Sequence, residues 1–343
     1  MLCFWKQLFL FMWIMLGINS WLGIGEIVMV VESIVFGPIP SRRLGLSLGV
    51  NNVYNKYCSY SCVYCQAGRT TRLIIDRRSY YDPHKLVEVV VRGVEEKKPD
   101  VVSFVPNGEP TLDKNLGLEA KLIKERINVP LAIFTNASLI YREDVVEDLL
   151  LFDIVSVKID TVNEKTWRKL NRPHPKLSLE RILEGIIDFS KRYRGKLLTE
   201  TMLVKNINIS IEEYEGIADY LSNIRFDKAY IQAPIRPPAE KFVTIPDKDD
   251  FLIAYNIFTE KLGENRVEIL NYPEQPLFKF SENLVEEVLK TINVHPIRLD
   301  YLKYIADKKD VDYEEILDKL LKTGKTMIVE YNGKKFIVPR RII

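Results

Sequence analysis

The sequence predicts an α/β protein in which parallel strands are covered by helices. Between residues 46 and 233, six short β-branched runs alternate strictly with segments whose apolar residues recur at the helical period. The 343 residues are 47% hydrophobic and 28% charged, which is ordinary for a chain with a large core. Strict alternation argues for a parallel sheet wrapped by helices, but periodicity alone does not separate an open doubly wound sheet from a barrel.

The expected elements follow one another with short loops. A helix is expected to begin at Pro83 because Asp82 is a suitable N-cap and proline suits the first helical turn. The helix expected at 179–193 shows a clear period of about 3.6 residues. The expected strands are 46–51, 101–105, 130–135, 154–160, 197–204 and 228–233, and the expected helices between them are 83–98, 116–126, 143–152, 179–193 and 211–224.

The pattern changes after residue 236, which ends the main domain expected at 29–236. Residues 237–280 are mixed, with several prolines and one helix expected near 247–262, and they are expected to close the open side of the sheet or barrel. From 281 onward, three helical segments precede a hairpin that turns at Asn332-Gly333, a signal for a type I′ turn. Three helices and a hairpin predict a small winged-helix-like domain at 281–343.

The first 28 residues differ from the rest in composition. Residues 8–25 carry no charged side chain and are long enough for a membrane helix or a signal-peptide core. Only Lys6 flanks them, so no cluster of basic residues sets an orientation. We expect the functional protein to begin at or near Met29, with an over-extended start before it. A genuine membrane anchor at 1–28 is the alternative.

Three cysteines lie within eight residues, as Cys58, Cys62 and Cys65, and Tyr64 precedes the last of them. Thiolates select soft metal centres. A tetrahedral structural zinc would need a fourth ligand, and the only other cysteine is Cys3. A [4Fe–4S] cluster held by three cysteines instead leaves one iron open for chemistry. Three buried apolar cysteines are the structural alternative. With three of four cysteines engaged, a disulfide framework is excluded and a reducing compartment is expected.

This spacing, with an aromatic residue before the third cysteine, resembles the radical S-adenosylmethionine (SAM) superfamily. The resemblance implies a partial (β/α)6 TIM-like barrel with the cysteine loop after the first strand. It implies that the open iron chelates the amino and carboxylate groups of SAM. An electron from the cluster then yields a 5′-deoxyadenosyl radical that abstracts hydrogen from a substrate. It also implies a cytoplasmic oxidoreductase that receives electrons from an external, flavodoxin- or ferredoxin-like donor.

Residues 104–112 contain a second element of this resemblance. Asn107, Gly108 and Glu109 resemble the Gly-Gly-Glu element of the superfamily, with asparagine in place of the first glycine. Glu109 would accept hydrogen bonds from the amino group of SAM. The alternative is a surface turn, since Asn, Gly and Pro build turns widely. The position of Tyr64 would place its ring against the adenine, with an ordinary packed aromatic as the alternative.

Polar side chains at the strand ends are further candidates. Asn136 follows the third strand and can reach the ribose or carboxylate of SAM. Within 154–160, Lys158 and Asp160 lie on one face, which is expected to face the interior because helices cover the outside. Burying them requires mutual pairing or a ligand, so an internal ion pair is the alternative. The expected catalytic residues are Lys158, Asp160 and Glu200, and the expected SAM contacts are Tyr64, Asn107, Gly108, Glu109, Asn136 and Gln232.

A narrower resemblance rests on residues 36–45 and 47–50. These resemble a group of Fe–S oxidoreductases related to the wyosine-type, 4-demethylwyosine synthase-like enzymes. Those enzymes carry a second set of cluster cysteines upstream, and this chain has none between Cys3 and Cys58. The tRNA-modifying function is therefore not carried over, and the substrate stays unidentified. Arg42 and Arg43 would hold a phosphate or carboxylate, or belong to a solvated surface.

Other partners are constrained only weakly. The formal net charge of +2 neither demands nor forbids a nucleic-acid partner. The helix expected at 313–321 begins among carboxylates, which disfavours phosphate binding there, so nucleic acid is possible but not favoured. A membrane partner is expected only if residues 1–28 form an anchor. A non-catalytic iron–sulfur protein for electron transfer or regulation is the alternative function. The histidines are expected to be linker residues rather than ligands: His84, His174 and His295.

Overall fold

The structure is a computed structural model that describes residues 34–54 and 56–340, so the hydrophobic segment 1–28 and the expected start at Met29 lie outside the described residues. Within the described part, eight strands form one sheet in the order β1-β2-β5-β6-β7-β8-β9-β10. Strands β2 to β10 are parallel to their neighbours, and β1 is antiparallel to β2. The strands are β1 Val35–Ser41, β2 Gly45–Val50, β5 Val101–Phe104, β6 Leu131–Thr135, β7 Ile154–Lys158, β8 Lys196–Met202, β9 Lys228–Gln232 and β10 Val267–Leu270.

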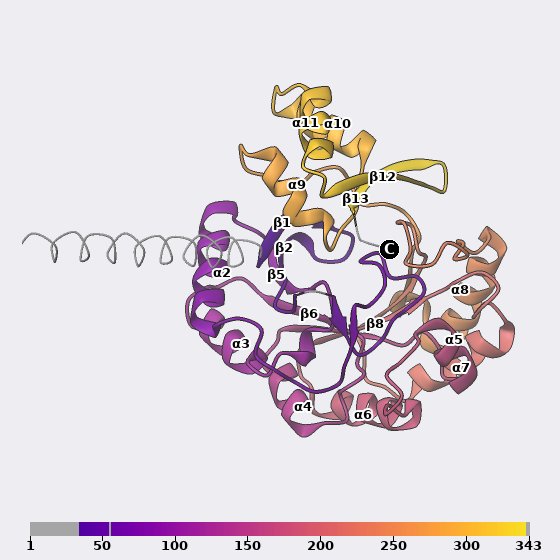
Figure 1. Cartoon of the computed structure of the whole chain (residues 1–343). Coiled ribbons are helices and arrows are strands. Elements are labelled where there is room, and N and C mark those ends of the chain that lie inside the picture. The colour runs from indigo at the N-terminus through magenta and orange to yellow at the C-terminus, as the bar shows by residue number, and fades with distance from the viewer. Residues whose placement is uncertain (1–33, 55, 341–343) are drawn as a thin grey trace, which may run out of the picture.

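Helices surround the outside of this sheet, as Figure 1 shows. Asp82 caps the first of them, accepting hydrogen bonds from the backbone N–H groups of His84 and Lys85, as its sequence predicts. Strand β5 is buried along its whole length, as expected for a parallel strand covered on both faces. The covering helices are α2 Pro83–Lys97, α3 Leu116–Lys124, α4 Glu143–Leu149, α5 Glu164–Leu170, α6 Leu179–Arg192, α7 Ile211–Ser222 and α8 Lys248–Leu262. The alternation predicted the parallel α/β sheet covered by helices, and its barrel-like form is the one that the superfamily resemblance implied.

Two strands of the eight-stranded sheet were not among the six expected. Strand β1 contains prolines 38 and 40, which cannot donate to a ladder, and it lies at the edge of the sheet where that loss is tolerated. Strand β10 has four residues and follows α8, within the stretch expected to close the barrel. It pairs in parallel with β9 and extends the sheet by one strand.

The sheet is a partial barrel because β1 and β10 occupy its two ends rather than pairing with each other. The side chain of Arg42 reaches from the end of β1 to the end of β10. The guanidinium of Arg42, just after β1, donates to the carbonyl oxygens of Leu270 at 2.8 Å and Tyr272 at 3.1 Å. Arg42 therefore connects the first and last strands of the sheet.

Residues 281–340, called the C-terminal unit, contain three helices and a three-stranded sheet in the order β11-β13-β12. They pack above β1 and β2 (Figure 1), where Phe36 and Ile39 join their apolar core. The expected turn is confirmed, since Asn332 and Gly333 both have positive φ between the paired strands β12 and β13. The winged-helix-like assignment stays a prediction. The elements are α9 Leu284–Ile292, β11 Ile297–Arg298, α10 Leu299–Lys308, α11 Tyr313–Lys322, β12 Thr326–Tyr331 and β13 Lys334–Pro339.

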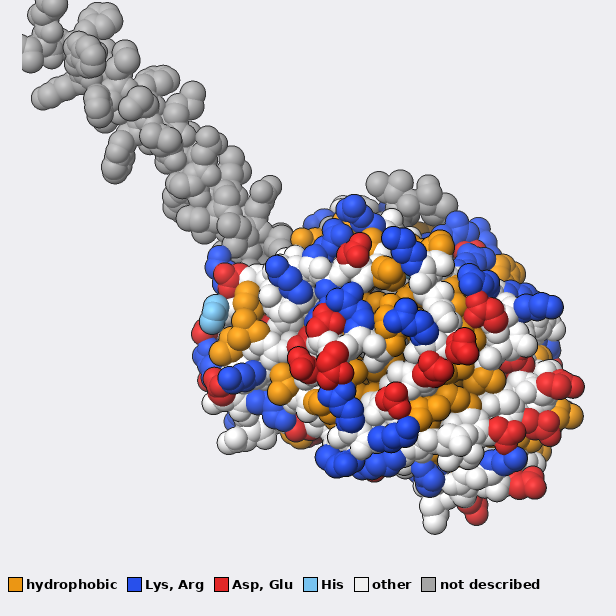
Figure 2. All heavy atoms as spheres, turned by 90° about the horizontal axis from the view of Figure 1, so that it is seen from below, with side chains coloured by type: hydrophobic (Ala, Val, Ile, Leu, Met, Phe, Trp, Pro, Cys, Tyr) orange, Lys and Arg blue, Asp and Glu red, His pale blue; other side chains and the backbone are white. Residues whose placement is uncertain are grey.

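The outer surface is mixed in charge. Seen from below the view of Figure 1, acidic and basic side chains are interspersed over one face, with apolar side chains gathered between them (Figure 2). This distribution agrees with a formal net charge of only +2. Among residues 34–54 and 56–340, none of the helices has the length and apolar composition needed to span a bilayer.

Candidate active site

The cysteine loop, residues 56–68, follows β2 at the carboxyl end of the parallel strands. Cys58 is buried, and Cys62 and Cys65 are partly exposed. Backbone hydrogen bonds from Cys65 N–H to the Cys62 carbonyl and from Gly68 N–H to the Cys65 carbonyl fold the loop back on itself. All three cysteines line one cavity of about 190 Å³, called the cluster cavity.

Buried charge surrounds the thiols. Burial raises the pKa of Cys58 to about 11 and that of Cys62 to about 12. Burial alone would lower the pKa of Lys56, but its attraction to the thiolates, first that of Cys65, raises it instead. The Lys56 side chain is buried, with 5% of the residue exposed. A buried ammonium beside three cysteines favours their thiolate forms, which are the forms that ligate metals.

Two asparagines donate to the sulfur atoms. Asn136 Nδ2 lies 3.6 Å from Cys58 Sγ, and Asn171 Nδ2 lies 3.4 Å from Cys62 Sγ. Asn136, an expected SAM contact, follows β6 and lines the cluster cavity. Asn171 was not expected, because it lies after α5 and is 109 residues from Cys62 along the chain. Hydrogen bonds of this kind tune the electronic properties of iron–sulfur centres.

Glu109 is buried at the wall of the cluster cavity, so the surface turn considered for this motif is not present. Its carboxylate accepts hydrogen bonds from the Thr135 hydroxyl at 2.6 Å, the Asn136 backbone N–H at 2.8 Å and both donors of Thr111. Burial raises the pKa of Glu109, and these donors oppose that shift. Glu109 thus connects the loop after β5 to the end of β6, beside the cysteines.

Gly108 touches the cysteine loop through its backbone. A Cβ atom at this position would lie 2.1 Å from the Tyr57 carbonyl oxygen, so only glycine allows this approach. The next backbone N–H, that of Glu109, donates to the same oxygen at 3.1 Å. Asn107 lines neither of the two cavities described here, and its backbone N–H donates to Asn51 Oδ1. The expected SAM contact by Asn107 therefore has no support from its placement.

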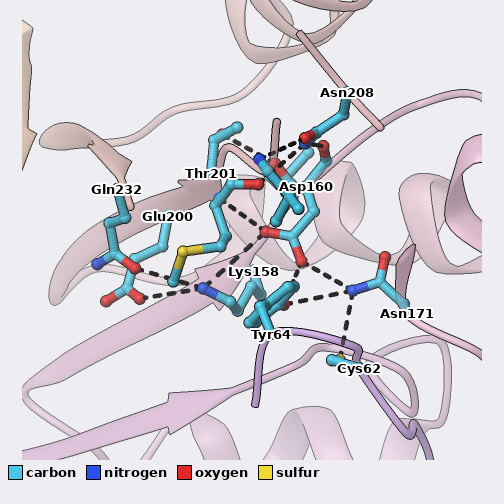
Figure 3. Close-up of polar contacts among 12 residues, drawn as sticks. Cys62, Tyr64, Lys158, Asp160, Asn171, Glu200, Thr201, Asn208 and Gln232 are labelled. Carbon is cyan, nitrogen blue, oxygen red and sulfur yellow. Dashed lines mark hydrogen bonds and ion pairs between the residues drawn. The ribbon is translucent and has the colours of Figure 1, made fainter. Parts of the chain in front are cut away.

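Tyr64 and Asp160 form a buried network under the cavity (Figure 3). The Tyr64 hydroxyl donates to Asp160, which also accepts from Asn171 Nδ2 at 2.8 Å and from the Met202 backbone N–H at 2.9 Å. The backbone oxygen of Asp160 accepts from Asn208 Nδ2. These contacts let Asp160 position Tyr64 and Asn171. Asp160 also lines the cluster cavity, and its expected catalytic role stays a prediction.

Lys158 lies at the centre of the polar strand ends, as Figure 3 shows. Its Nζ is 3.9 Å from an Asp160 oxygen, 3.7 Å from a Glu200 oxygen and 3.4 Å from Gln232 Oε1. It also lies 5.3 Å from the centroid of the Tyr64 ring. The Lys158–Asp160 ion pair, considered as the alternative to a ligand contact, is present, although Lys158 is shared with Glu200.

Glu200 is held by two cations from different parts of the chain. It pairs with Arg43 as well as with Lys158, and it accepts a hydrogen bond from the Ser156 hydroxyl at 2.9 Å. Burial alone would raise the pKa of Glu200, but Arg43 and Lys158 together lower it below its usual range. Arg43 also lies over the Phe134 ring. It is therefore part of the barrel interior and not of a solvated surface.

A second cavity of about 310 Å³, called the arginine cavity, adjoins the first. The two share several lining residues, which are Tyr64, Cys65, Phe134, Lys158 and Glu200. Gln232, expected to contact SAM, lines only the arginine cavity. Residues that the sequence did not indicate as site residues also line it, namely Gln66, Arg236, Glu274 and His295. They come from segments far apart in sequence and carry no local motif.

His295 was expected to be a linker residue, and the structure corrects this. Its Nε2 lies 2.8 Å from Glu274 Oε1, and Glu274 also pairs with Arg236. Burial and Arg236 lower the pKa of His295, whereas Glu274 opposes the shift. Tertiary packing of the C-terminal unit places this histidine in the wall of the arginine cavity.

Comparison with known proteins agrees with the cysteine loop and barrel. Residues 52–221 match the family model of the radical SAM superfamily. The chain belongs to the radical SAM superfamily. A UPF0026 protein of Methanocaldococcus jannaschii is 44% identical over 307 residues, covering 89% of this chain and 95% of that protein. A UPF0026 protein of Helicobacter pylori is 30% identical over 291 residues, covering 83% and 91%. A radical SAM methyltransferase structure from Sphaerobacter thermophilus aligns with a TM-score of 0.49 and 14% identity, over 66% of each chain.

Members of this superfamily use a [4Fe–4S] cluster and SAM, and these are the cofactors of this protein. The residues present suit them: three thiols, a buried lysine and two asparagine donors to sulfur meet at one cavity. Among the residues that the structure describes, no three His, Cys, Asp or Glu side chains converge on a single metal ion. A cubane cluster does not require such convergence, because each cysteine binds a different iron.

Proposed function

We propose that Cys58, Cys62 and Cys65 hold three irons of a [4Fe–4S] cluster and that SAM binds in the cluster cavity. The observation that carries the proposal is the meeting of these cysteines with Glu109 and Asn136 in that cavity. When bound, the reduced cluster and SAM supply the radical that abstracts hydrogen from a substrate. An electron carrier would have no need of a polar cavity beside its cluster.

The protein's own residues bind and orient in this proposal. Glu109 accepts three hydrogen bonds at Oε1 and one at Oε2, so its position is fixed while Oε2 keeps an acceptor site for the amino group of SAM. Tyr64 presents its ring to the cavity while Asp160 fixes its hydroxyl. Lys158 faces both cavities and is placed to contact the SAM carboxylate or the substrate. Glu200 holds Lys158 in place.

The surroundings of the reaction follow from this chemistry. We propose a cytoplasmic oxidoreductase, because a reduced cluster and a supply of SAM both require a reducing compartment. The electron would come from a flavodoxin- or ferredoxin-like donor, and nucleic acid is not a favoured partner. Cys65, a proposed cluster ligand, is partly exposed and also lines the arginine cavity.

The test is anaerobic reconstitution with iron and sulfide. The wild-type protein is expected to bind one [4Fe–4S] cluster and, once reduced, to cleave SAM slowly to 5′-deoxyadenosine without substrate. Cys58→Ala is expected to lose both the cluster and the cleavage, because one iron would lack its ligand. Ser222→Ala is the control and should keep both, since Ser222 is exposed at the end of α7 and lies outside the motif.

Two measurements decide the result: iron and sulfide content per chain, and 5′-deoxyadenosine by chromatography. A wild-type protein that holds a reducible cluster but neither binds nor cleaves SAM would contradict the proposal. The iron–sulfur electron-transfer or regulatory function would then replace it.

A further inference from the structure

The arginine cavity lies against the proposed site of radical formation. It shares Lys158, Tyr64 and the cysteine Cys65 with the cluster cavity. A molecule bound there would contact the same residues as SAM bound in the proposed position. Its volume of about 310 Å³ is at the lower end of the range of roughly 300–1,000 Å³ for small-molecule sites. The cavity is therefore suited to a small metabolite.

The lining has more positive than negative charge. Its four permanent cations are Arg42, Arg43, Lys158 and Arg236, and its two carboxylates are Glu200 and Glu274. His295 adds no charge near neutral pH, because burial and Arg236 lower its pKa. Apart from Cys65, which is assigned to the cluster, the lining carries an excess of two positive charges, one of which Asp160 offsets from the adjoining cluster cavity through its ion pair with Lys158. Excess charge in a buried site is costly unless a counter-charge is bound.

The excess positive charge of the lining lies mainly on the arginines. Burial, then Arg236 and Arg43, lower the pKa of Arg42 to about 10, and these effects exceed the attraction of the two glutamates. Arg42 donates to backbone carbonyls of Leu270 and Tyr272 and has no carboxylate partner of its own. The Nε of Arg43 is buried without a hydrogen-bond partner. Planar guanidinium groups in this setting are suited to carboxylate or phosphate oxygens.

Much of the remaining lining is apolar. Phe36, Ile39, Val105 and Val294 belong to one apolar cluster at its wall, and Phe134 and Ala233 also line it. An inorganic anion would leave these surfaces uncovered, whereas an organic anion would bury an apolar body against them. The arginines and the apolar wall together therefore favour a ligand that carries a negative charge and an apolar body.

We propose that the arginine cavity binds the substrate and that the substrate is a small organic anion, whose carboxylate or phosphate is held by Arg42, Arg43 and Arg236. This assignment rests on the proposed function, since it places the ligand beside the cluster cavity. It adds the substrate's chemical class. Glu274 then holds Arg236 and His295 in position and limits the positive charge, rather than binding the substrate.

The experiment uses calorimetry on the reconstituted full-length protein with three probes at matched ionic strength. Phenyl phosphate and benzoate are the anions, and benzyl alcohol is the neutral probe. The wild type is expected to bind at least one anion about tenfold or more tightly than the alcohol, as loss of a charge-assisted contact implies. Binding of the alcohol as tightly as the anions, or no saturable binding at millimolar concentration, would overturn the proposal.

Two variants with opposite expected effects separate charge from misfolding. Arg236→Gln should weaken anion binding about tenfold or more, and Glu274→Gln should strengthen it several-fold by removing a competing carboxylate. Arg168→Gln is the matched control and should bind like wild type, because Arg168 is exposed on α5 and pairs only with Glu164. Weaker anion binding in Glu274→Gln, or equal affinity in wild type and Arg236→Gln, would refute the assignment.

Failure here is distinguishable from failure of the proposed function. A wild type that cleaves SAM but shows no anion preference would remove only the substrate class. A protein that neither holds a cluster nor cleaves SAM, yet binds anions through Arg236, would remove only the proposed function. Binding of a single-stranded oligonucleotide through Arg236 without binding of either small anion would also overturn this inference.

Discussion

Gly108 is the residue where the loop after β5 touches the cysteine loop. We predict that Gly108→Ala lowers the free energy of unfolding by about 1–3 kcal/mol, the usual cost of forcing extra volume into a packed site. The reason is the 2.1 Å approach of the new Cβ to the Tyr57 carbonyl oxygen, a backbone atom that cannot rotate away. Iron content after reconstitution should also fall, because Tyr57 adjoins Cys58.

Chemical denaturation and iron analysis check this prediction. Gly216→Ala on α7 is the matched control, since its Cβ would meet only a methyl group of Val162, at 3.0 Å, which can shift. That variant should be close to wild type in both measurements. A Gly108→Ala protein with wild-type stability and iron content would show that the close approach is not required.

At the scale of elements, α3 presents a buried carboxyl group to the turn before it. Glu119 on this helix and Asp113 are both fully buried and interact. Burial raises the pKa of Asp113 to about 7 and that of Glu119 well above its ordinary value. Both groups therefore stay protonated in the folded protein at a pH where the unfolded chain has lost the protons. Their contribution to stability is present at low pH and is lost as pH rises toward and through neutrality.

We predict that the wild type loses stability between pH about 4 and 7 more steeply than Glu119→Gln, which lacks one of the two titrating groups. At pH 8 the variant should be more stable, on the order of 1–3 kcal/mol, because one buried carboxyl group fewer has to ionise there. Urea unfolding across this pH range gives the comparison. Glu88→Gln, an exposed residue on α2, should reproduce the wild-type slope. Equal slopes for the wild type and Glu119→Gln would show that the pair does not titrate.

The sequence predicted those elements whose signal is local. All six expected strands form, because each is a short β-branched run between helices of clear period. Asp82 caps its helix and Asn332-Gly333 forms the hairpin turn, as predicted. Strand β1 was not expected because prolines obscure its pattern, and β10 because four residues carry little signal. Helix α5 was also not expected, since a helix of seven residues shows less than two turns of periodicity.

The residues of the candidate site also divide into those with a local sequence signal and those without one. Cys58, Cys62, Cys65 and Glu109 were predictable because each belongs to a contiguous motif. Asn171, Arg236 and His295 were not, since their partners are brought together only by folding: Arg236 meets Gln66 across 170 positions of sequence. Alternation within β7 correctly placed Ser156, Lys158 and Asp160 toward the cavity. It could not show that Asp160 also accepts hydrogen bonds from Tyr64 and Asn171.

At the scale of the whole molecule, the C-terminal unit has its own apolar core, joined to the barrel through Phe36 and Ile39. We predict that Ile337→Ala, which truncates a fully buried side chain of that core, lowers the stability of this unit by about 2–4 kcal/mol. The barrel has a separate core, so iron content should be retained. Hydrogen exchange should speed up in α9 to α11 and β11 to β13, and much less in β5 to β8.

Ile328→Ala is the control, because Ile328 on β12 is 37% exposed and its truncation removes little buried area. Its exchange should match that of the wild type. Uniform acceleration across barrel and C-terminal unit in Ile337→Ala would show that the two fold as one cooperative body instead.

Gln66 follows the last cluster cysteine and holds the C-terminal unit at the same time. Its amide donates to the Val294 carbonyl at 2.9 Å, and its oxygen accepts from Arg236 at 3.0 Å. One side chain thus links the chain next to Cys65 to a segment 228 residues away, in addition to the apolar contacts of Phe36 and Ile39. Thermodynamic reciprocity applies to such a link: whatever favours the ordered cysteine loop must favour docking to the same degree, and a ligand that seats the C-terminal unit must favour the ordered loop in return.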